Sequence, residues 1–123
     1  MLHPYIIFSD SEILIRNIKF AFEGSIDFSS FETPSCILQN TFENNLKLII
    51  VDLDMKIENH ISAVKVFREI SEKVPVLFLV SEKRVVELLD IFGGLRTINT
   101  PANWLMKPYS RNALISSVQQ LCV

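Results

Sequence analysis

The sequence lacks the features that would mark a secreted, membrane-spanning or disordered protein. Its two cysteines, Cys36 and Cys122, belong to no recognisable motif, and the isolated His3 and His60 form no metal-binding spacing with them. The longest apolar runs, such as residues 48–51, are far too short to cross a bilayer, and the N-terminus lacks the pattern of a signal peptide. With 49% hydrophobic residues but only three glycines and five prolines, the composition is globular. We therefore expect a cytoplasmic protein with reduced thiols and no membrane association.

The sequence also lacks an excess of basic residues. Twelve lysines and arginines stand against fourteen aspartates and glutamates, which gives a net charge of −2. A nucleic-acid-binding surface would need a clustered basic excess, so we expect no direct contact with nucleic acid. No repeat, low-complexity tract or linker divides the chain, and we expect one domain over residues 1–123.

The sequence does contain a regular alternation of strand-like and helix-like segments. Strands are expected at residues 5–9, 25–29, 46–53, 76–80 and 104–106. Helices are expected from a cap at Asp10 or Ser11 to Gly24, over residues 34–44, 59–73 and 82–92, and after a cap at Ser110. Five strands that alternate with five helices predict a parallel sheet covered on both faces, in which ligands bind where the strands end.

Charged side chains follow three of the expected strands. Asp10 comes after the first strand, Asp52 and Asp54 end the third, and Lys107 ends the fifth. Carboxylates at one edge of a sheet repel each other, and a divalent cation or a lysine relieves that repulsion. Mg²⁺ prefers such oxygen ligands, and a carboxylate beside it can accept a phosphoryl group. Solvated residues with no common role are the alternative, because Asp and Lys are common where strands run into loops.

Three segments of the chain carry a resemblance to a known family. They are Ile6-Ile7-Phe8-Ser9-Asp10-Ser11-Glu12-Ile13-Leu14-Ile15-Arg16, Leu48-Ile49-Ile50-Val51-Asp52-Leu53-Asp54-Met55 and Trp104-Leu105-Met106-Lys107-Pro108-Tyr109. Over its whole length the sequence resembles a response-regulator receiver domain of bacterial two-component systems, and the last segment is the most specific. The resemblance implies an α/β, flavodoxin-like (βα)5 fold: a doubly wound, five-stranded parallel sheet with strand order 2-1-3-4-5.

The resemblance also implies a metal site. Asp52 resembles the phosphoacceptor. Asp10 resembles the first residue of an acidic pair, and this pair would hold Mg²⁺ together with Asp52 and the backbone carbonyl of Asp54. The second residue of that pair is Ser11, which is a weaker Mg²⁺ ligand than a carboxylate. Glu12 is a possible substitute, although a glutamate in the first turn of a helix is also favoured by the helix dipole.

The remaining site residues belong to the last two strands. Lys107 resembles the lysine that contacts the phosphoryl group, and Pro108 is expected to follow a cis peptide bond. Trp104 lies at the position of the switch aromatic, with a plain core aromatic as the alternative. The family's hydroxyl at the end of the fourth strand aligns with Val80, so Ser81 is the candidate switch hydroxyl only if that strand end is slipped or bulged.

The resemblance implies a function in two-component signal transduction rather than an enzyme activity. A histidine kinase or phosphotransfer protein would phosphorylate Asp52 and change the surface offered to a downstream partner or output domain, with a homodimer through the last helices as a further possibility. Because Ser11 and Val80 depart from the family's pattern, a pseudo-receiver that binds partners without phosphorylation is the alternative. An unrelated flavodoxin-like enzyme or nucleotide-binding protein is disfavoured, because no glycine-rich phosphate loop follows the first strand.

Overall fold

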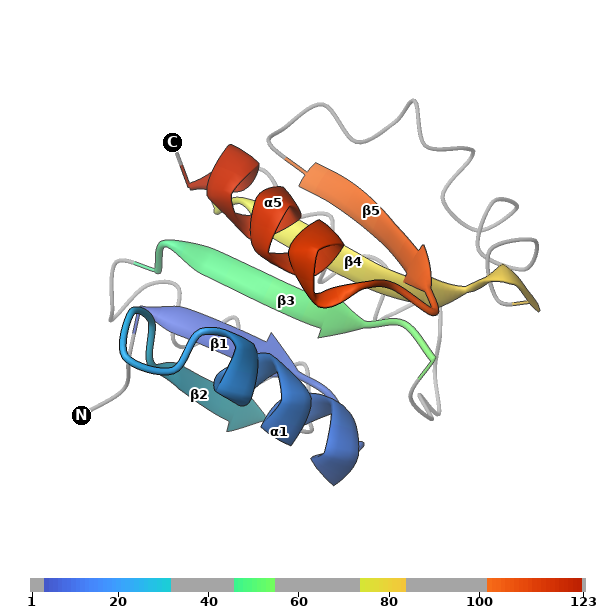
Figure 1. Ribbon diagram of the computed structural model, residues 1–123, viewed down its shortest axis with the longest axis horizontal. Coiled ribbons are helices and arrows are strands. Elements are labelled where there is room, and N and C mark those ends of the chain that lie inside the picture. The colour runs from blue at the N-terminus through green and yellow to red at the C-terminus, as the bar shows by residue number, and fades with distance from the viewer. Residues whose placement is uncertain (1–3, 32–45, 55–73, 84–101, 123) are drawn as a thin grey trace.

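The computed structural model describes residues 4–31, 46–54, 74–83 and 102–122 (Figure 1). These ranges contain five strands and two helices. The helices predicted over residues 34–44 and 59–73, and most of the one predicted over 82–92, lie outside the described residues. Cys36, His3 and His60 lie outside them as well.

The five strands form one parallel sheet. They are β1 (Tyr5–Phe8), β2 (Phe28–Phe31), β3 (Leu48–Asp52), β4 (Val76–Ser81) and β5 (Ala102–Lys107). Their order across the sheet is β2-β1-β3-β4-β5, and every neighbouring pair is parallel. This confirms the predicted flavodoxin-like architecture and its strand order. Because all strands run the same way, their carboxyl ends lie along one edge of the sheet (Figure 1).

All five strands differ from their predicted bounds by one to three residues at one or both ends, and the starts of β2 and β5 show the physical reasons. β2 begins at Phe28 rather than Ser25, because Ser25 still belongs to the turn after the first helix, where its N–H and its hydroxyl both donate to the carbonyl of Phe22 at 3.0 Å. β5 begins at Ala102 rather than Trp104, since Ala102 already pairs with Val76 of β4. The apolar pattern located both strands, but backbone pairing decides where each one starts.

Each described helix begins at a serine cap. α1 (Glu12–Ala21) follows Ser11, whose hydroxyl accepts a hydrogen bond from the N–H of Leu14 at 3.3 Å. α5 (Arg111–Leu121) follows Ser110, whose hydroxyl accepts from the N–H of Ala113 at 3.0 Å. These bonds satisfy N–H groups that a helix start otherwise leaves without partners. Neither described helix is long and apolar enough to cross a membrane.

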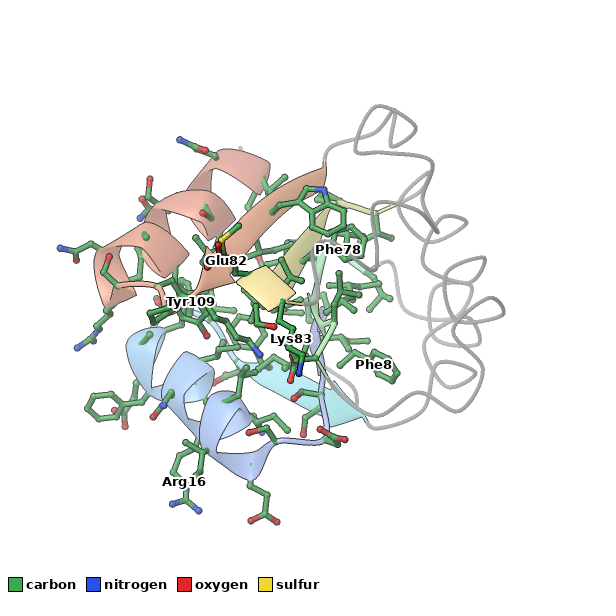
Figure 2. All side chains as sticks on the ribbon, turned by 90° about the vertical axis from the view of Figure 1, so that its right-hand side faces the viewer. Phe8, Arg16, Phe78, Glu82, Lys83 and Tyr109 are labelled. Carbon is green, nitrogen blue, oxygen red and sulfur yellow. The ribbon has the colours of Figure 1, made fainter. Side chains whose placement is uncertain are left out.

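Both helices pack on the same face of the sheet (Figure 2). Ile18 and Phe22 of α1 and Leu114 and Val118 of α5 are buried against that face. The strand residues beneath them include Ile7, Leu48, Ile50, Leu77 and Leu79, all fully buried. β3 is buried at all five positions, as expected for a central parallel strand with apolar residues on both faces. This apolar core holds the strand ends, and the polar side chains that follow them, in fixed positions.

Candidate functional site

Asp52, the last residue of β3, is a buried carboxylate that is fully hydrogen-bonded. Only 3% of it is exposed. Its Oδ2 accepts from the hydroxyl of Ser9 at 2.7 Å, and its Oδ1 accepts from Lys107 Nζ at 2.8 Å and from the N–H of Asp54 at 3.1 Å. A buried charge is tolerated only when it is paired and hydrogen-bonded, and these three donors meet that requirement.

Lys107 joins two carboxylates. Its Nζ lies 2.8 Å from Asp52 Oδ1 and 3.0 Å from Asp54 Oδ2. Burial alone would lower the pKa of Lys107, but the ion pairs with Asp52 and Asp54 outweigh burial and raise that pKa above its ordinary value. The ammonium therefore stays charged at neutral pH and relieves the repulsion between the two aspartates.

The side chain of Asp54 binds more than the lysine. Its Oδ2 also accepts from the N–H of Ser81 at 2.9 Å, and its Oδ1 accepts from the hydroxyl of Ser81 at 2.8 Å. Burial would raise the pKa of Asp54, but the hydrogen bonds from Ser81 and Lys107 hold it below its ordinary value. We name the group formed by Ser9, Asp52, Asp54, Ser81 and Lys107 the Asp52 cluster. It lies at the edge of the sheet that Figure 2 faces.

Ser9 is a member of this cluster that the sequence analysis missed. Its hydroxyl is fully buried, donates to Asp52 and accepts from the N–H of Ser11 at 3.0 Å. The strand register explains its position. Phe8 of β1 pairs with Val51 of β3, so the residues that follow them, Ser9 and Asp52, lie side by side. The sequence shows a polar residue at the end of an apolar strand, but its register with Asp52 is known only from the structure.

The other residues after β1 lie differently. Asp10 is exposed, Ser11 uses its hydroxyl to cap α1, and Glu12 is an exposed first residue of that helix. Glu12 therefore lies where a carboxylate interacts favourably with the helix dipole. This is the alternative to a role as an Mg²⁺ ligand.

The structure also places the predicted residues of β4 and β5. Ser81 reaches Asp54 with both its N–H and its hydroxyl, while Val80 is buried. The peptide bond between Lys107 and Pro108 is cis. Trp104 is half-buried and stacks on Phe78, with ring centroids 4.7 Å apart and an interplanar angle of 25°.

The residues predicted to hold Mg²⁺ offer suitable donors. The two carboxylates of Asp10 and Asp52 and the backbone carbonyl of Asp54 are hard oxygen ligands, which Mg²⁺ prefers. Among the residues that the structure describes, no three His, Cys, Asp or Glu side chains form a group that could hold a metal ion. Mg²⁺ needs fewer side chains than that, because it keeps several waters and is usually bound by one or two carboxylates and a phosphate. By their chemistry these oxygen donors suit this ion, and Lys107 already neutralises part of the carboxylate charge.

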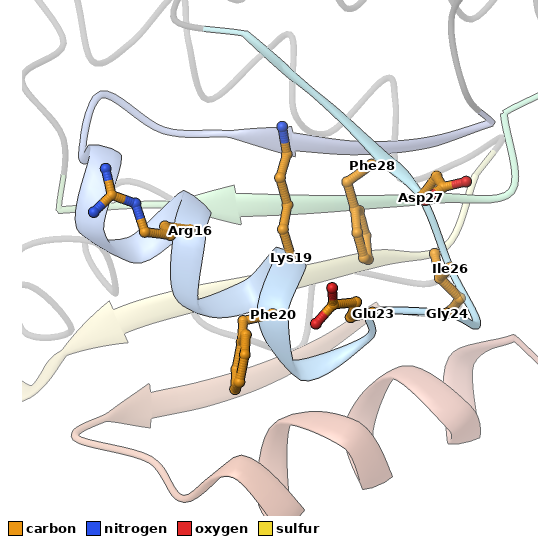
Figure 3. Close-up of a pocket in the computed structure, with 8 residues that line it drawn as sticks. All are labelled: Arg16, Lys19, Phe20, Glu23, Gly24, Ile26, Asp27 and Phe28. Atoms are coloured by element: carbon orange, nitrogen blue, oxygen red, sulfur yellow. The ribbon is translucent and has the colours of Figure 1, made fainter.

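A hollow of about 460 Å³ lies at the opposite edge of the sheet (Figure 3). It lies between the end of α1 and the start of β2 and is lined by Arg16, Lys19, Phe20, Glu23, Gly24, Ile26, Asp27 and Phe28. Phe28 pairs with Tyr5 at the beginning of β1, whereas the Asp52 cluster lies where the strands end. This hollow is therefore separate from the cluster, and none of the predicted site residues lines it.

Comparisons with known proteins show which solved structures share this architecture. No family model matches the sequence, and no curated protein matches it. Among solved structures, the chain is similar to the N-terminal signal receiver domain of a two-component response regulator from Bacteroides fragilis, with 11% identity, a TM-score of 0.74, and coverage of 100% of this chain and 98% of that one. It is also similar to the chemotaxis response regulator CheY4 of Vibrio cholerae, with 17% identity, a TM-score of 0.71, and coverage of 98% and 99%.

A third similar structure is a response regulator receiver modulated diguanylate cyclase from Pelobacter carbinolicus. It shows 19% identity and a TM-score of 0.65, and the match covers 95% of this chain and 89% of that one. At such identities the likeness establishes the fold, and the roles of individual residues have to come from the site itself. The chain has the fold of a response-regulator receiver domain.

Proposed function

We propose that this chain is a signalling domain that accepts a phosphoryl group on Asp52. The observation that carries the proposal is the 2.8 Å ion pair between Asp52, buried at the end of β3, and Lys107 at the end of β5. An aspartate can act as a nucleophile toward a phosphoryl group, and a fixed cation beside it stabilises the charge of the transferring oxygens. Lys107 and Asp54 are each 24% exposed, so the cluster is open to a donor on their side.

The proposed donor is a phosphohistidine on a histidine kinase or phosphotransfer protein. An oxygen of the Asp52 carboxylate attacks the phosphorus, an O–P bond forms, and the P–N bond to the imidazole breaks. The departing nitrogen keeps the bonding electrons and takes up a proton, so no oxidant or reductant is needed. Lys107 remains beside the product, because its Nζ already contacts Asp52 Oδ1.

We also propose that Mg²⁺ assists this reaction. Asp10, Asp52 and the backbone carbonyl of Asp54 would hold the ion. When bound, it would lower the repulsion between the Asp52 carboxylate and the negative oxygens of the donor. Lys107 serves the same electrostatic purpose from β5, and Ser9 orients the carboxylate by donating to its Oδ2.

The output of the domain is proposed to be a changed surface. A phosphoryl group adds about −1.5 to −2 charges beside Lys107 and thereby shifts the balance of contacts at the ends of β4 and β5. Trp104, stacked on Phe78 between these two strands, is the proposed reporter of that shift. The partners would be a downstream protein or output domain, with a homodimer through the last helices as the proposed assembly.

The direct test is phosphorylation by a small donor. The protein is incubated with phosphoramidate and MgCl₂, and its intact mass is measured over time. We expect an adduct of about 80 Da, the mass of one phosphoryl group, that hydroxylamine removes. Asp52→Asn should form no adduct, whereas the exposed Asp27→Asn should behave as the unmodified sequence does. A folded protein that forms no adduct with this donor or with a phosphorylated kinase would overturn the proposal in favour of a phosphorylation-independent pseudo-receiver.

A further inference from the structure

Three hydrogen-bond donors converge on the carboxylate of Asp54. The ammonium of Lys107 lies 3.0 Å from Oδ2, the N–H of Ser81 lies 2.9 Å from the same oxygen, and the hydroxyl of Ser81 lies 2.8 Å from Oδ1. One cation, one backbone amide and one hydroxyl, all directed at the two oxygens of a single group, constitute an anion-binding site. In the unmodified protein, the carboxylate of Asp54 occupies this site.

The same donors lie where a phosphoryl group on Asp52 would need them. Lys107 touches Asp52 Oδ1 and Asp54 Oδ2 at once, so oxygens attached through Asp52 would fall within reach of the same ammonium. A phosphoryl group brings about −1.5 to −2 charges and three strong acceptor oxygens, which a carboxylate next to it would repel. The two anions therefore compete for one set of donors.

We propose that the Asp54 carboxylate occupies the site in place of a phosphoryl group. An oxyanion, or a phosphoryl group on Asp52, must displace this carboxylate from Lys107 and Ser81. The part that concerns Asp52 rests on the function proposed above, whereas the anion site itself rests on the geometry alone. The side chain of Asp54 thus regulates the site: it slows phosphorylation and holds Ser81 and Lys107 together when no phosphoryl group is present.

The contacts of Asp54 support this competition. Its two oxygens accept from three donors, so another anion can use those donors only after the Asp54 carboxylate has left them. Its 24% exposure leaves one side open to solvent, so the side chain has room to turn away when another anion enters.

The test is a titration with inorganic phosphate, which binds without covalent chemistry. The backbone amide of Ser81 is followed by NMR in the unmodified protein, in Asp54→Ala and in Asp54→Asn. Glu82→Gln is the matched control, because it removes an equal charge from an exposed residue beside Ser81 without touching the cluster. We expect the phosphate concentration at half-saturation to fall at least about tenfold in Asp54→Ala relative to both the unmodified protein and Glu82→Gln.

Adding Lys107→Met to Asp54→Ala should abolish the gain, because the anion then lacks its cation. Half-saturation values within twofold of one another in all proteins would overturn the proposal. Asp54→Asn, which keeps the shape of the side chain and loses its charge, provides the answer if Asp54→Ala does not fold.

The phosphoramidate reaction on the same proteins separates this proposal from the function on which it partly rests. Faster formation of the Asp52 adduct in Asp54→Ala, by about tenfold, is expected. An adduct that forms at the same rate in both proteins would contradict the competition and leave the phosphoacceptor function intact. Tighter phosphate binding in Asp54→Ala with no adduct in any protein would support the anion site and overturn the phosphoacceptor function.

Discussion

The ion pair between Lys107 and Asp52 should be a measurable part of the stability of the fold. The change we consider is Lys107→Met, which keeps most of the apolar stem and removes the ammonium. Asp52, 3% exposed, would keep the hydrogen bonds from Ser9 and from the N–H of Asp54 but lose its only described cationic partner. A buried carboxylate without a cation is costly, because the protein interior solvates charge poorly.

The magnitude follows from the exposure of the two groups. A hydrogen bond to a charged group contributes about 1.5–3 kcal/mol, and breaking a fully buried ion pair costs about 3–5 kcal/mol. Asp52 is buried, but the side chain of Lys107 is 24% exposed, so water recovers part of the loss. We therefore expect Lys107→Met to lower the free energy of unfolding by about 2–3 kcal/mol. The exposed Lys47→Met should change it by less than about 0.5 kcal/mol.

The assay is a double-mutant cycle in urea, read by circular dichroism. The free energy of unfolding is measured for Lys107→Met, for Asp52→Asn and for the double variant. The double variant should be more stable than the sum of the single losses predicts, by about 2 kcal/mol, because neither charge is then left alone. Losses that add within about 0.5 kcal/mol would refute the reasoning, since the two side chains would then not stabilise each other.

Three further predictions concern Asp54, Ser9 and the packing of α1. Asp54→Asn should lower the free energy of unfolding in urea at neutral pH. Because the pKa of Asp54 is lowered in the folded protein, the stabilisation by its carboxylate is lost as this carboxylate becomes protonated. The difference between the variant and the unmodified protein should therefore shrink as the pH falls below about 4. Ser9→Ala should cost about 1–3 kcal/mol, since Asp52 Oδ2 would lose its buried donor; an unchanged urea midpoint would count against that hydrogen bond. Ile18→Ala, at a fully buried position of α1, should cost about 2–5 kcal/mol in thermal or urea unfolding, whereas Ile13→Ala on the same helix, where 72% of the side chain is exposed, should cost less than about 1 kcal/mol.

Much of the fold could be predicted from the apolar pattern. Leu48–Asp52 is apolar on both faces until its last residue, which is typical of a central parallel strand followed by a functional side chain. The cap at Ser110 could be predicted as well, and Ser11 was one of two candidates with Asp10 for the first cap, because these residues precede helical apolar periods. Strand ends were less predictable: β2 begins at Phe28 because a turn continues through Ser25, and local propensity does not reveal that turn.

The site could be predicted only in part, for a physical reason. The sequence predicts that Asp10, Asp52, Asp54 and Lys107 lie at one edge of the sheet. The structure joins Asp52, Asp54 and Lys107 there through ion pairs, whereas Asp10 is exposed. Ser81 contacts Asp54 although the end of β4 is neither slipped nor bulged, since Ser81 pairs with Lys107 in regular register. The hydrogen bond from Ser9 to Asp52 was not predicted, because it depends on the register between β1 and β3. Nor did the sequence predict that Asp54 would use its carboxylate, since a side chain in a turn can point in several directions and three-dimensional contacts choose among them.

The most direct test of the central claim identifies the phosphorylated residue itself. The protein is treated with phosphoramidate and MgCl₂, then with borohydride, which reduces an acyl phosphate to an alcohol and so converts the modified aspartate to homoserine. Peptide mass spectrometry then locates the conversion. Homoserine at position 52, absent when the donor is omitted, is the predicted result. Homoserine at position 54 or 10 instead, or at none of the three, would contradict the assignment of Asp52 as the phosphoacceptor.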